Sequence, residues 1–148
     1  MTRFKNGFTK RKALLVVMVV AALLIGLILL RALSGGGEDL SSTEGRQAYL
    51  QSLGWEIDPA SESSKRVLIP RRLEGALNEY NEMLKTQGFD LNKHLGEQCE
   101  QVTYLVTNYP KGDQTVLVTL YIQGKRLIAG DIHSTSLNGF MHGLKEGK

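Results

Sequence analysis

The sequence predicts an α+β protein with an N-terminal transmembrane helix. The small domain after it should hold an antiparallel three-stranded meander plus one or two short strands, packed against one main helix and one short helix. Three observations support this prediction. Residues 13–30 carry no polar side chain, apolar residues recur every three or four positions between 73 and 84, and three segments rich in Val, Thr, Leu and Ile follow residue 100.

The segment from Ala13 to Leu30, ALLVVMVVAALLIGLILL, predicts the transmembrane helix. Eighteen residues in a helix are about 27 Å long, which approaches the hydrocarbon thickness of a bilayer. Five basic residues and no acid precede it, whereas Arg31 is soon followed by Glu38 and Asp39. Because basic flanks stay in the cytoplasm, the C-terminal part should lie outside the membrane. We expect a cytoplasmic basic tail (1–12), a transmembrane helix (13–33), a flexible tether (34–42) and an extracytoplasmic domain (43–148).

A cleaved signal peptide is the alternative for the same segment. Ala32-Leu33-Ser34 fits a small-x-small cleavage site, so cleavage near Ser34 would release a secreted protein. The apolar run is longer than the 7–15 residues of the apolar region in a usual signal peptide, which favours a retained anchor. The first expected partner is therefore the lipid bilayer, contacted through residues 13–33.

The distribution of charge argues against a nucleic-acid partner. Six of the 18 lysines and arginines lie at or before Arg31, whereas all 15 aspartates and glutamates lie after it. Residues 32–148 thus hold 12 basic against 15 acidic residues, a formal net charge of −3. The overall basic pI comes from the inner flank of the anchor. Cys99 is the only cysteine, so no intramolecular disulfide can form, and we expect it to be a buried apolar residue.

The first part of the exported segment predicts one short helix and two short strands. Ser41-Ser42-Thr43-Glu44 has the form of a capping box, and Gly54 marks the end of the helix that follows. Residues 55–57 alternate as a short strand with Trp55 in the core, and a serine-rich loop follows. Residues 66–70 form a second short strand that ends at Pro70.

The main helix and the meander come next. Leu73, Leu77, Tyr80 and Leu84 form the apolar stripe of an amphipathic helix, which should stop at Gly88. Strands are expected at residues 101–109, 115–122 and 126–132, with turns at 111–113 and 123–125. The main helix should cover one face of this meander.

Three residues near the C-terminus are candidate metal ligands. Asp131 and His133 are two apart on a strand, so they share a face, and His142 could complete an Asp/His/His set for zinc or iron. In the alternative interpretation Ile128, Gly130 and Ile132 form the buried face, which leaves Asp131 and His133 facing outward or capping the end of the sheet. The spacing H-x8-H matches no strong metal motif.

The polar run after His133 raises the hypothesis of a hydrolase. Ser134, Thr135 and Ser136 adjoin a histidine, but no G-x-S-x-G or S-x-x-K motif is present. These residues better fit a turn or a short C-terminal helix capped by Ser136 or Asn138, with Phe140 and Met141 closing the end of the core. We therefore predict no catalytic residue, no cofactor-binding residue and no cofactor.

Four segments resemble a known family. YLQSLGWEIDPASESSKRVLIP, YNEMLKTQGFDLNKHLG, VTYLVTNYP and AGDIHSTSLNGFMHGL are similar to the bacterial domain-of-unknown-function family numbered 4830, over roughly residues 46–144. The segment Leu73–Leu77 looks smaller than the usual start of the family's helix. The resemblance implies a membrane or exported protein of Gram-positive, clostridial type, and it implies no activity.

The function predicted from these features is a binding or interaction module at the bacterial cell surface. It would be single-pass and membrane-anchored, with a protein, a peptide or an envelope polymer as its ligand. An envelope hydrolase or metal-dependent enzyme using Asp131, His133 and His142 is one alternative. A regulatory or inhibitory ectodomain acting on a neighbouring membrane protein is another.

Overall fold

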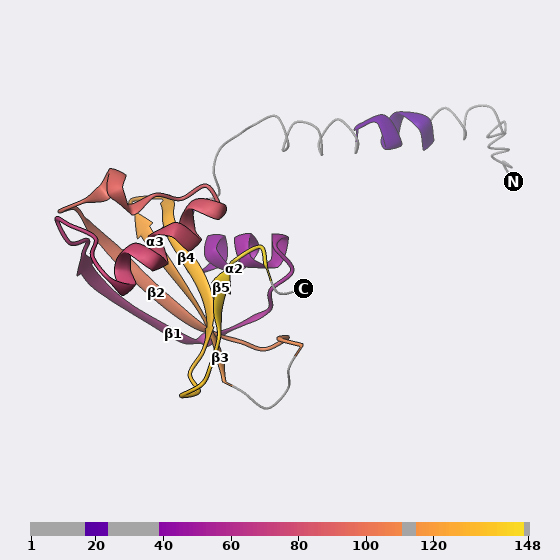
Figure 1. The fold of residues 1–148 in the computed structure, drawn as a ribbon. Coiled ribbons are helices and arrows are strands. Elements are labelled where there is room, and N and C mark those ends of the chain that lie inside the picture. Colours follow the sequence, from indigo (N-terminus) through magenta and orange to yellow (C-terminus); the bar gives the residue numbers. More distant parts are fainter. Residues whose placement is uncertain (1–16, 24–38, 111–114, 147–148) are drawn as a thin grey trace, which may run out of the picture. The chain divides into compact units, whose positions relative to one another are not determined.

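A computed structural model describes residues 17–23, 39–110 and 115–146 (Figure 1). The chain divides into two compact units, Met1–Gly36 and Gly37–Lys148. In the first unit, residues 17–23 are helical and their apolar side chains are exposed. Within the described ranges, no helix has both the length and the apolar character needed to cross a membrane. Most of the predicted span, the basic tail and the tether up to residue 38 lie outside these ranges.

The second unit is an α+β domain built on one five-stranded antiparallel sheet with strand order β1-β2-β3-β4-β5. Its elements are α2 (Thr43–Ser52), β1 (Ile57–Leu68), α3 (Ala76–Thr86), the 3-10 helix η1 (Leu91–His94), β2 (Gln98–Val106), β3 (Val116–Gln123), β4 (Arg126–Ser134) and β5 (Met141–Gly143). Strands β2, β3 and β4 are the predicted meander, and the two-residue β3–β4 turn places Gly124 at φ 62°.

Strand β1 replaces the two short strands and the serine-rich loop that the sequence predicts. It pairs with β2 from Ile57 to Leu68, with a register shift between Asp58 and Ser63. Among the residues between Asp58 and Ser63, Ser61 accepts at its Oγ a hydrogen bond of 2.8 Å from the Leu105 amide. Pro59 is tolerated because β1 is an edge strand and is bulged at this point. Long-range pairing therefore overrides the local turn signal.

Helix α2 begins one residue later than the predicted capping box. The side chain of Ser42, not Ser41, accepts the capping hydrogen bond, from the Gly45 amide at 3.1 Å. The predicted stop is confirmed, because Gly54 has φ 86°. The folded domain also extends further toward the N-terminus than expected. Leu40 is buried, and Asp39 lies 2.6 Å from Lys125 Nζ.

Helix α3 confirms the predicted main helix and its glycine stop, with Gly88 at φ 89°. It starts at Ala76, so Leu73 precedes it and packs from the connecting segment. Asn81 is fully buried on its inner side. The Asn81 side chain accepts from the Leu91 amide at 2.7 Å and donates to Asp90 at 3.0 Å, which fixes the turn into η1.

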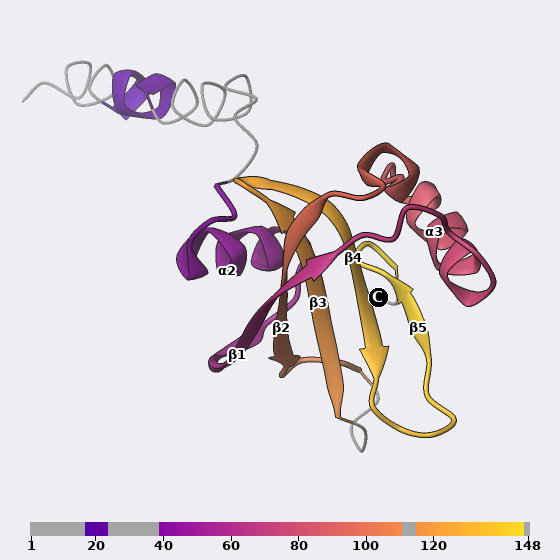
Figure 2. The same ribbon diagram turned by 90° about the vertical axis from the view of Figure 1, so that its left-hand side faces the viewer.

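The sheet has a core on each face, because α2 and α3 lie on opposite sides of it (Figure 2). The larger core lies on the side of α2, and the main helix α3 covers the other face of the meander, as predicted. The buried members of the larger core include Leu50, Trp55, Tyr104, Leu120, Ile132 and Leu144. The smaller core lies under α3 and includes Leu84, Leu91, Cys99, Ile128 and Ala129. Burial of Trp55 and of Cys99 is confirmed, and burial raises the pKa of the Cys99 thiol.

The C-terminal segment forms a fifth strand, and of the turn and the short helix that the sequence allows after His133, the structure has the turn. Met141 is 52% exposed on β5, while Leu144 is 1% exposed and closes the core. The Trp55 indole N–H donates to the Leu144 carbonyl at 2.6 Å. A Cβ on Gly130 would lie 2.7 Å from Leu144 Cδ1, so glycine is needed for this approach. Phe140 packs at the edge of the same core, and Met141 does not.

Candidate functional site

An open groove lies between α3 and the neighbouring part of the sheet. It has a volume of about 530 Å³. It is lined by nine residues, three from α3, three from β2 and β3, and three from β4 and β5: Ala76, Leu77, Tyr80, Gln101, Thr119, Tyr121, Asp131, His133 and Met141. Apolar walls with a few polar groups on the floor are typical of ligand sites. The groove brings together two of the three candidate residues that the sequence predicts.

Asp131 is a buried carboxylate at the floor of the groove, with 2% of its surface exposed. The Tyr80 hydroxyl donates to its Oδ2 at 2.7 Å, and His133 Nδ1 lies 2.7 Å from its Oδ1. Each oxygen thus has a donor, which a buried charge requires. The pKa of Tyr80 is raised by burial first and by the charge of Asp131 second, so Tyr80 stays a proton donor.

Asp131 and His133 lie on the same face of the sheet, as predicted. This face is covered by α3, whereas the alternative interpretation expected the two side chains to face outward or to cap the end of the sheet. A register shift leaves Ile128 without a partner residue on β3, so the alternation of side chains changes there. As a result Ile128 packs under α3 and Ile132 packs in the core on the side of α2. Asp131 therefore lies under α3.

His133 presents one ring nitrogen to the groove. Its side chain is 25% exposed, and Nδ1 is held by Asp131. Within the described part of the chain Nε2 has no hydrogen-bond partner. The hydrogen bond to Asp131 raises the pKa of His133, while burial opposes the shift. Because Asp131 holds the Nδ1 proton, Nε2 accepts a hydrogen bond when the ring is neutral and donates one when it is charged.

His142 does not join this pair. It is opposite Ile132 in the β4–β5 ladder, so its side chain lies on the face of α2. Its Nδ1 donates to the Gly143 carbonyl at 2.8 Å, and the Tyr109 hydroxyl lies 3.0 Å from Nε2. The ring stacks on Phe140, with the two planes 11° apart. Both nitrogens of His142 are thus engaged on the opposite side of the sheet from Asp131.

The predicted metal set is therefore not assembled in this structure. Among the described residues, no group of three or more His, Cys, Asp or Glu side chains is placed to hold a metal ion. The groove supplies one carboxylate and one imidazole that are bonded to each other. An Asp–His pair orients an imidazole, and by itself it is not a structural zinc site.

A turn follows β4, as predicted; Ser134 is the last residue of the strand, and Thr135 and Ser136 lead into the turn. The Ser134 amide donates to the Phe140 carbonyl at 3.0 Å, and the Ser136 amide donates to Ser134 Oγ at 3.1 Å. The Thr135 amide donates to the Thr115 carbonyl at 3.0 Å. Ser134 is next to His133 on β4, so it lies on the other face of the sheet. No nucleophile–base pair arises from these neighbours.

Sequence reasoning assigned Tyr80 only to an apolar stripe and did not find its bond to Asp131. A tyrosine in the buried stripe of a helix is itself the available signal, because a buried phenol needs a polar partner. A second network was missed as well. Arg46 is 4% exposed, and its guanidinium donates to Tyr104 at 2.6 Å and to Glu62 at 2.9 Å. Burial, above all, raises the pKa of Tyr104 to about 12. This network joins α2 to β1 and stabilises the fold.

The model of one protein family, Domain of unknown function (DUF4830), matches residues 49–132. This match covers more than half of the chain and runs from the middle of α2 into β4, where it includes Asp131 and ends one residue before His133. The chain belongs to the DUF4830 family. The resemblance that the sequence suggested is thereby confirmed. No curated protein and no solved structure gave a significant match to the chain.

Proposed function

We propose that this DUF4830 protein is a single-pass, membrane-anchored binding module displayed outside the cell, and that the groove beside α3 is its ligand site. The apolar run at residues 13–30 and the basic residues before it support the anchor and its orientation. The observation that carries the binding site is the hydrogen bond from His133 to the buried Asp131, which aims a polar ring nitrogen into an apolar groove.

The groove suits a ligand with an apolar part and a hydrogen-bonding group. Leu77 and Met141 provide apolar contact, and Met141 is largely exposed on the edge strand. Orienting His133 through a buried partner lowers the entropy lost on binding. A protein or peptide segment offers both kinds of group, and it could also pair with the short edge strand β5.

Site-specific photo-crosslinking in intact cells tests this proposal. A photoreactive side chain replaces Leu77 in the groove or, as the matched control, Lys85 on the outer surface of the same helix. We expect a discrete crosslinked species from position 77 and none from position 85, with loss of the species in His133→Ala. Crosslinks of equal yield at the two positions, or none at position 77, would contradict the groove as the site.

The identity of the crosslinked species separates the alternatives. A neighbouring membrane protein would favour the regulatory ectodomain, whereas a wall fragment would favour an envelope-polymer ligand. The enzyme alternative retains one observation, the Asp131–His133 pair, which can act as a general base on water. Turnover of the captured ligand by the purified protein, abolished by His133→Gln, would replace the binding module with that alternative.

The anchor has its own test. We expect the full chain to stay in the membrane fraction after alkaline extraction, with residues 1–33 present in the mature protein. A mature N-terminus near Ser34 in the medium would instead establish the cleaved signal peptide.

A further inference from the structure

One end of the domain is defined by the place where the chain enters it. The Leu40 amide donates to the Lys125 carbonyl, and Asp39 forms an ion pair with Lys125 in the β3–β4 turn. The pairs Leu68–Gln98 and Glu100–Ile122 place the end of β1 and the start of β2 at this same end. We call this region, which holds the β3–β4 turn, the end of β1 and η1, the tether end.

The length of the tether limits how far the tether end can be from a bilayer. The predicted span ends at residue 33, so five residues lie between it and Asp39. The six Cα–Cα steps from residue 33 to residue 39 reach at most about 22 Å in any conformation. Strand β4 alone, with nine residues, is about 30 Å long. If residues 13–33 are the anchor, as the proposed function holds, the tether end stays close to the membrane surface, and an inverted orientation in which only the opposite end rests on the lipid is excluded.

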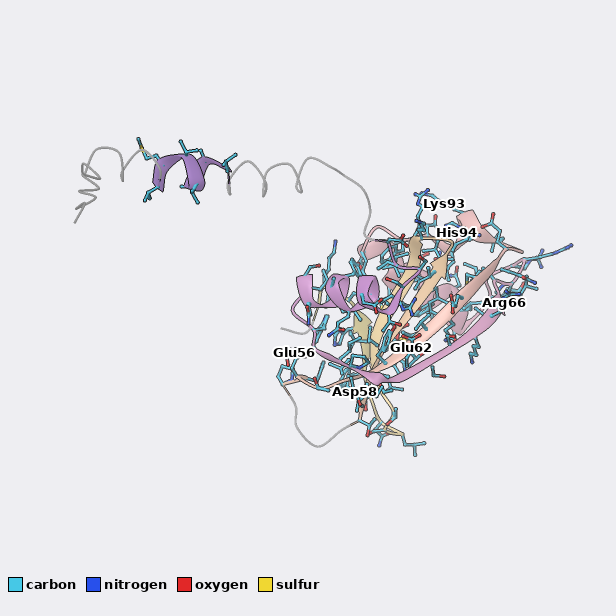
Figure 3. The ribbon with its side chains drawn as sticks, turned by 180° about the vertical axis from the view of Figure 1, so that it is seen from behind. Glu56, Asp58, Glu62, Arg66, Lys93 and His94 are labelled. Carbon is cyan, nitrogen blue, oxygen red and sulfur yellow. The ribbon has the colours of Figure 1, made fainter. Side chains whose placement is uncertain are left out.

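Exposed cations without an ion pair gather at the tether end. Within the part of the chain that the structure describes, five such residues lie there: Lys65, Arg66, Arg71, Lys93 and Arg126. Figure 3 shows Arg66 and Lys93 toward one end of the domain and Glu56 and Asp58 toward the other. The tether end is thus the basic end of the domain.

The acids at the tether end are mostly engaged within the domain. Asp39 pairs with Lys125, Glu97 bonds to His94 and Gln123, Glu74 pairs with Arg72, and Asp90 bonds to Asn81 and Asn92. Within the described residues, Glu44 and Glu100 are the acids of this end without such a partner. Asp90 and Glu97 keep their charge, because amide side chains are neutral partners. The described residues of the tether end thus hold seven cations, the five above with Lys125 and Arg72, against six acids, a formal net charge of +1, whereas residues 32–148 as a whole carry −3.

The same end also exposes apolar side chains. Leu68 is 61% exposed and Leu95 is 37% exposed. Beside Leu68 lies an open concavity of about 540 Å³, whose lining includes Lys65 and Arg66. Cations together with exposed leucines are the combination by which protein surfaces bind at the interface of an anionic membrane.

We propose that the tether end docks on the outer surface of the membrane that anchors the chain, by binding the phosphate groups of anionic phospholipids. The inference rests on the proposed anchor and adds an orientation to it. His133 is seven residues along β4 from Arg126, about 23 Å farther from the tether end. Docking in this way holds the His133 end of the groove away from the lipid and open to ligands, whereas Gln101 and Tyr121, in register with Lys65, form the end of the groove nearer the tether end.

Vesicle sedimentation of residues 37–148 tests the lipid contact. This unit contains both cores and is compact by itself, so it serves as the soluble probe. We expect binding to vesicles of 30% phosphatidylglycerol in phosphatidylcholine at low salt, loss of binding at 0.5 M NaCl, and none to pure phosphatidylcholine. Equal binding to the two kinds of vesicle, or binding to neither, would overturn the proposal.

A matched pair of variants locates the contact. Lys93→Gln and Lys145→Gln each remove one exposed lysine charge, but only Lys93, in η1, belongs to the tether end (Figure 3). Lys145 follows β5, whose last residue, Gly143, is opposite Asp131. We expect Lys93→Gln to lower the partition coefficient about fivefold and Lys145→Gln to leave it nearly unchanged. An equal loss in the two variants would show a response to net charge alone and would contradict a specific surface. A soluble glycerol-phosphate polymer is added at the same phosphate concentration as the vesicles. If it abolishes vesicle binding completely, the surface binds wall polymer, and the lipid proposal is rejected.

The full chain tests the orientation. A fluorophore is attached at Asn92→Cys at the tether end or at Glu56→Cys at the opposite end; the native Cys99 is buried and its thiol pKa is raised. In bilayers with a headgroup-bound quencher we expect strong quenching at position 92 and weak quenching at position 56. Similar quenching at both positions would refute docking even if the protein remains anchored. Release of a mature chain beginning near Ser34 would instead overturn the anchor and, with it, the length restraint.

Discussion

The Tyr80 hydroxyl donates a 2.7 Å hydrogen bond to Oδ2 of Asp131 and so connects the main helix to the floor of the groove. The contact spans 51 residues of sequence and supplies one of the two donors that the buried carboxylate has in this structure. It stabilises α3 over β4, and it leaves the other oxygen to orient His133. Stability of the fold and geometry of the groove therefore depend on the same bond.

Tyr80→Phe should lower the free energy of unfolding by about 1.5–3 kcal/mol, the range for a hydrogen bond to a charged group. Tyr121→Phe is the comparison, because the Tyr121 hydroxyl accepts a 3.1 Å bond from the neutral Gln101 side chain and interacts with the Tyr80 hydroxyl, but does not donate to Asp131 in this structure. We expect it to cost about 1 kcal/mol or less. Urea denaturation of residues 37–148 measures both. Equal losses would show that the charge of Asp131 adds nothing to the Tyr80 bond.

Leu144→Ala should destabilise the domain by about 2–5 kcal/mol, because Leu144 is 1% exposed and fills the space against Gly130. Met141→Ala should change the stability by less than about 0.5 kcal/mol, because its side chain is half exposed on β5. Thermal unfolding of the two variants compares them directly. A larger loss in Met141→Ala would restore the sequence-based expectation that Phe140 and Met141 close the core.

Patterns that act over a few residues were sufficient to predict much of the fold. The α3 stripe, Gly54, Gly88 and the Gly124 turn are local signals, and the structure confirms each of them. Strand β5 has three residues, and it exists because it pairs with residues 131–133. No period can be detected in so short a segment.

The candidate site was predictable only in part, for a physical reason. The spacing of Asp131 and His133 predicts their shared face, since side chains alternate along a strand. Which face is covered depends on the bulge at Ile128 and on where α3 lies, and both are tertiary features. The pairing of β5 with β4 was needed to see that His142, opposite Ile132, lies on the other side of the sheet. Sequence spacing alone could not separate it from Asp131.

Ser42→Ala should cost about 1 kcal/mol, because it removes the side chain that caps α2. Ser41→Ala should cost less, because Ser41 is exposed and lies outside the helix. The urea midpoints of the two variants provide the measurement. If Ser41→Ala were the more destabilising change, the capping box predicted from Ser41 to Glu44 would be correct after all.

The bond between His133 and Asp131 should make the stability of the domain depend on pH. The pKa of His133 is raised in the folded state, chiefly by this bond, above the value of about 6.5 expected in the unfolded chain. The folded state therefore binds the proton more tightly. The stabilisation is fully present below pH 6.5, and it is lost as the pH rises through the folded pKa.

NMR titration should show a lower pKa for His133 in Asp131→Asn than in the unmodified protein. His133→Gln should remove the corresponding part of the decline in unfolding free energy above pH 6.5. A His133 pKa that is unchanged in Asp131→Asn would mean that the carboxylate does not hold the imidazole, and the groove would then lose its oriented polar group.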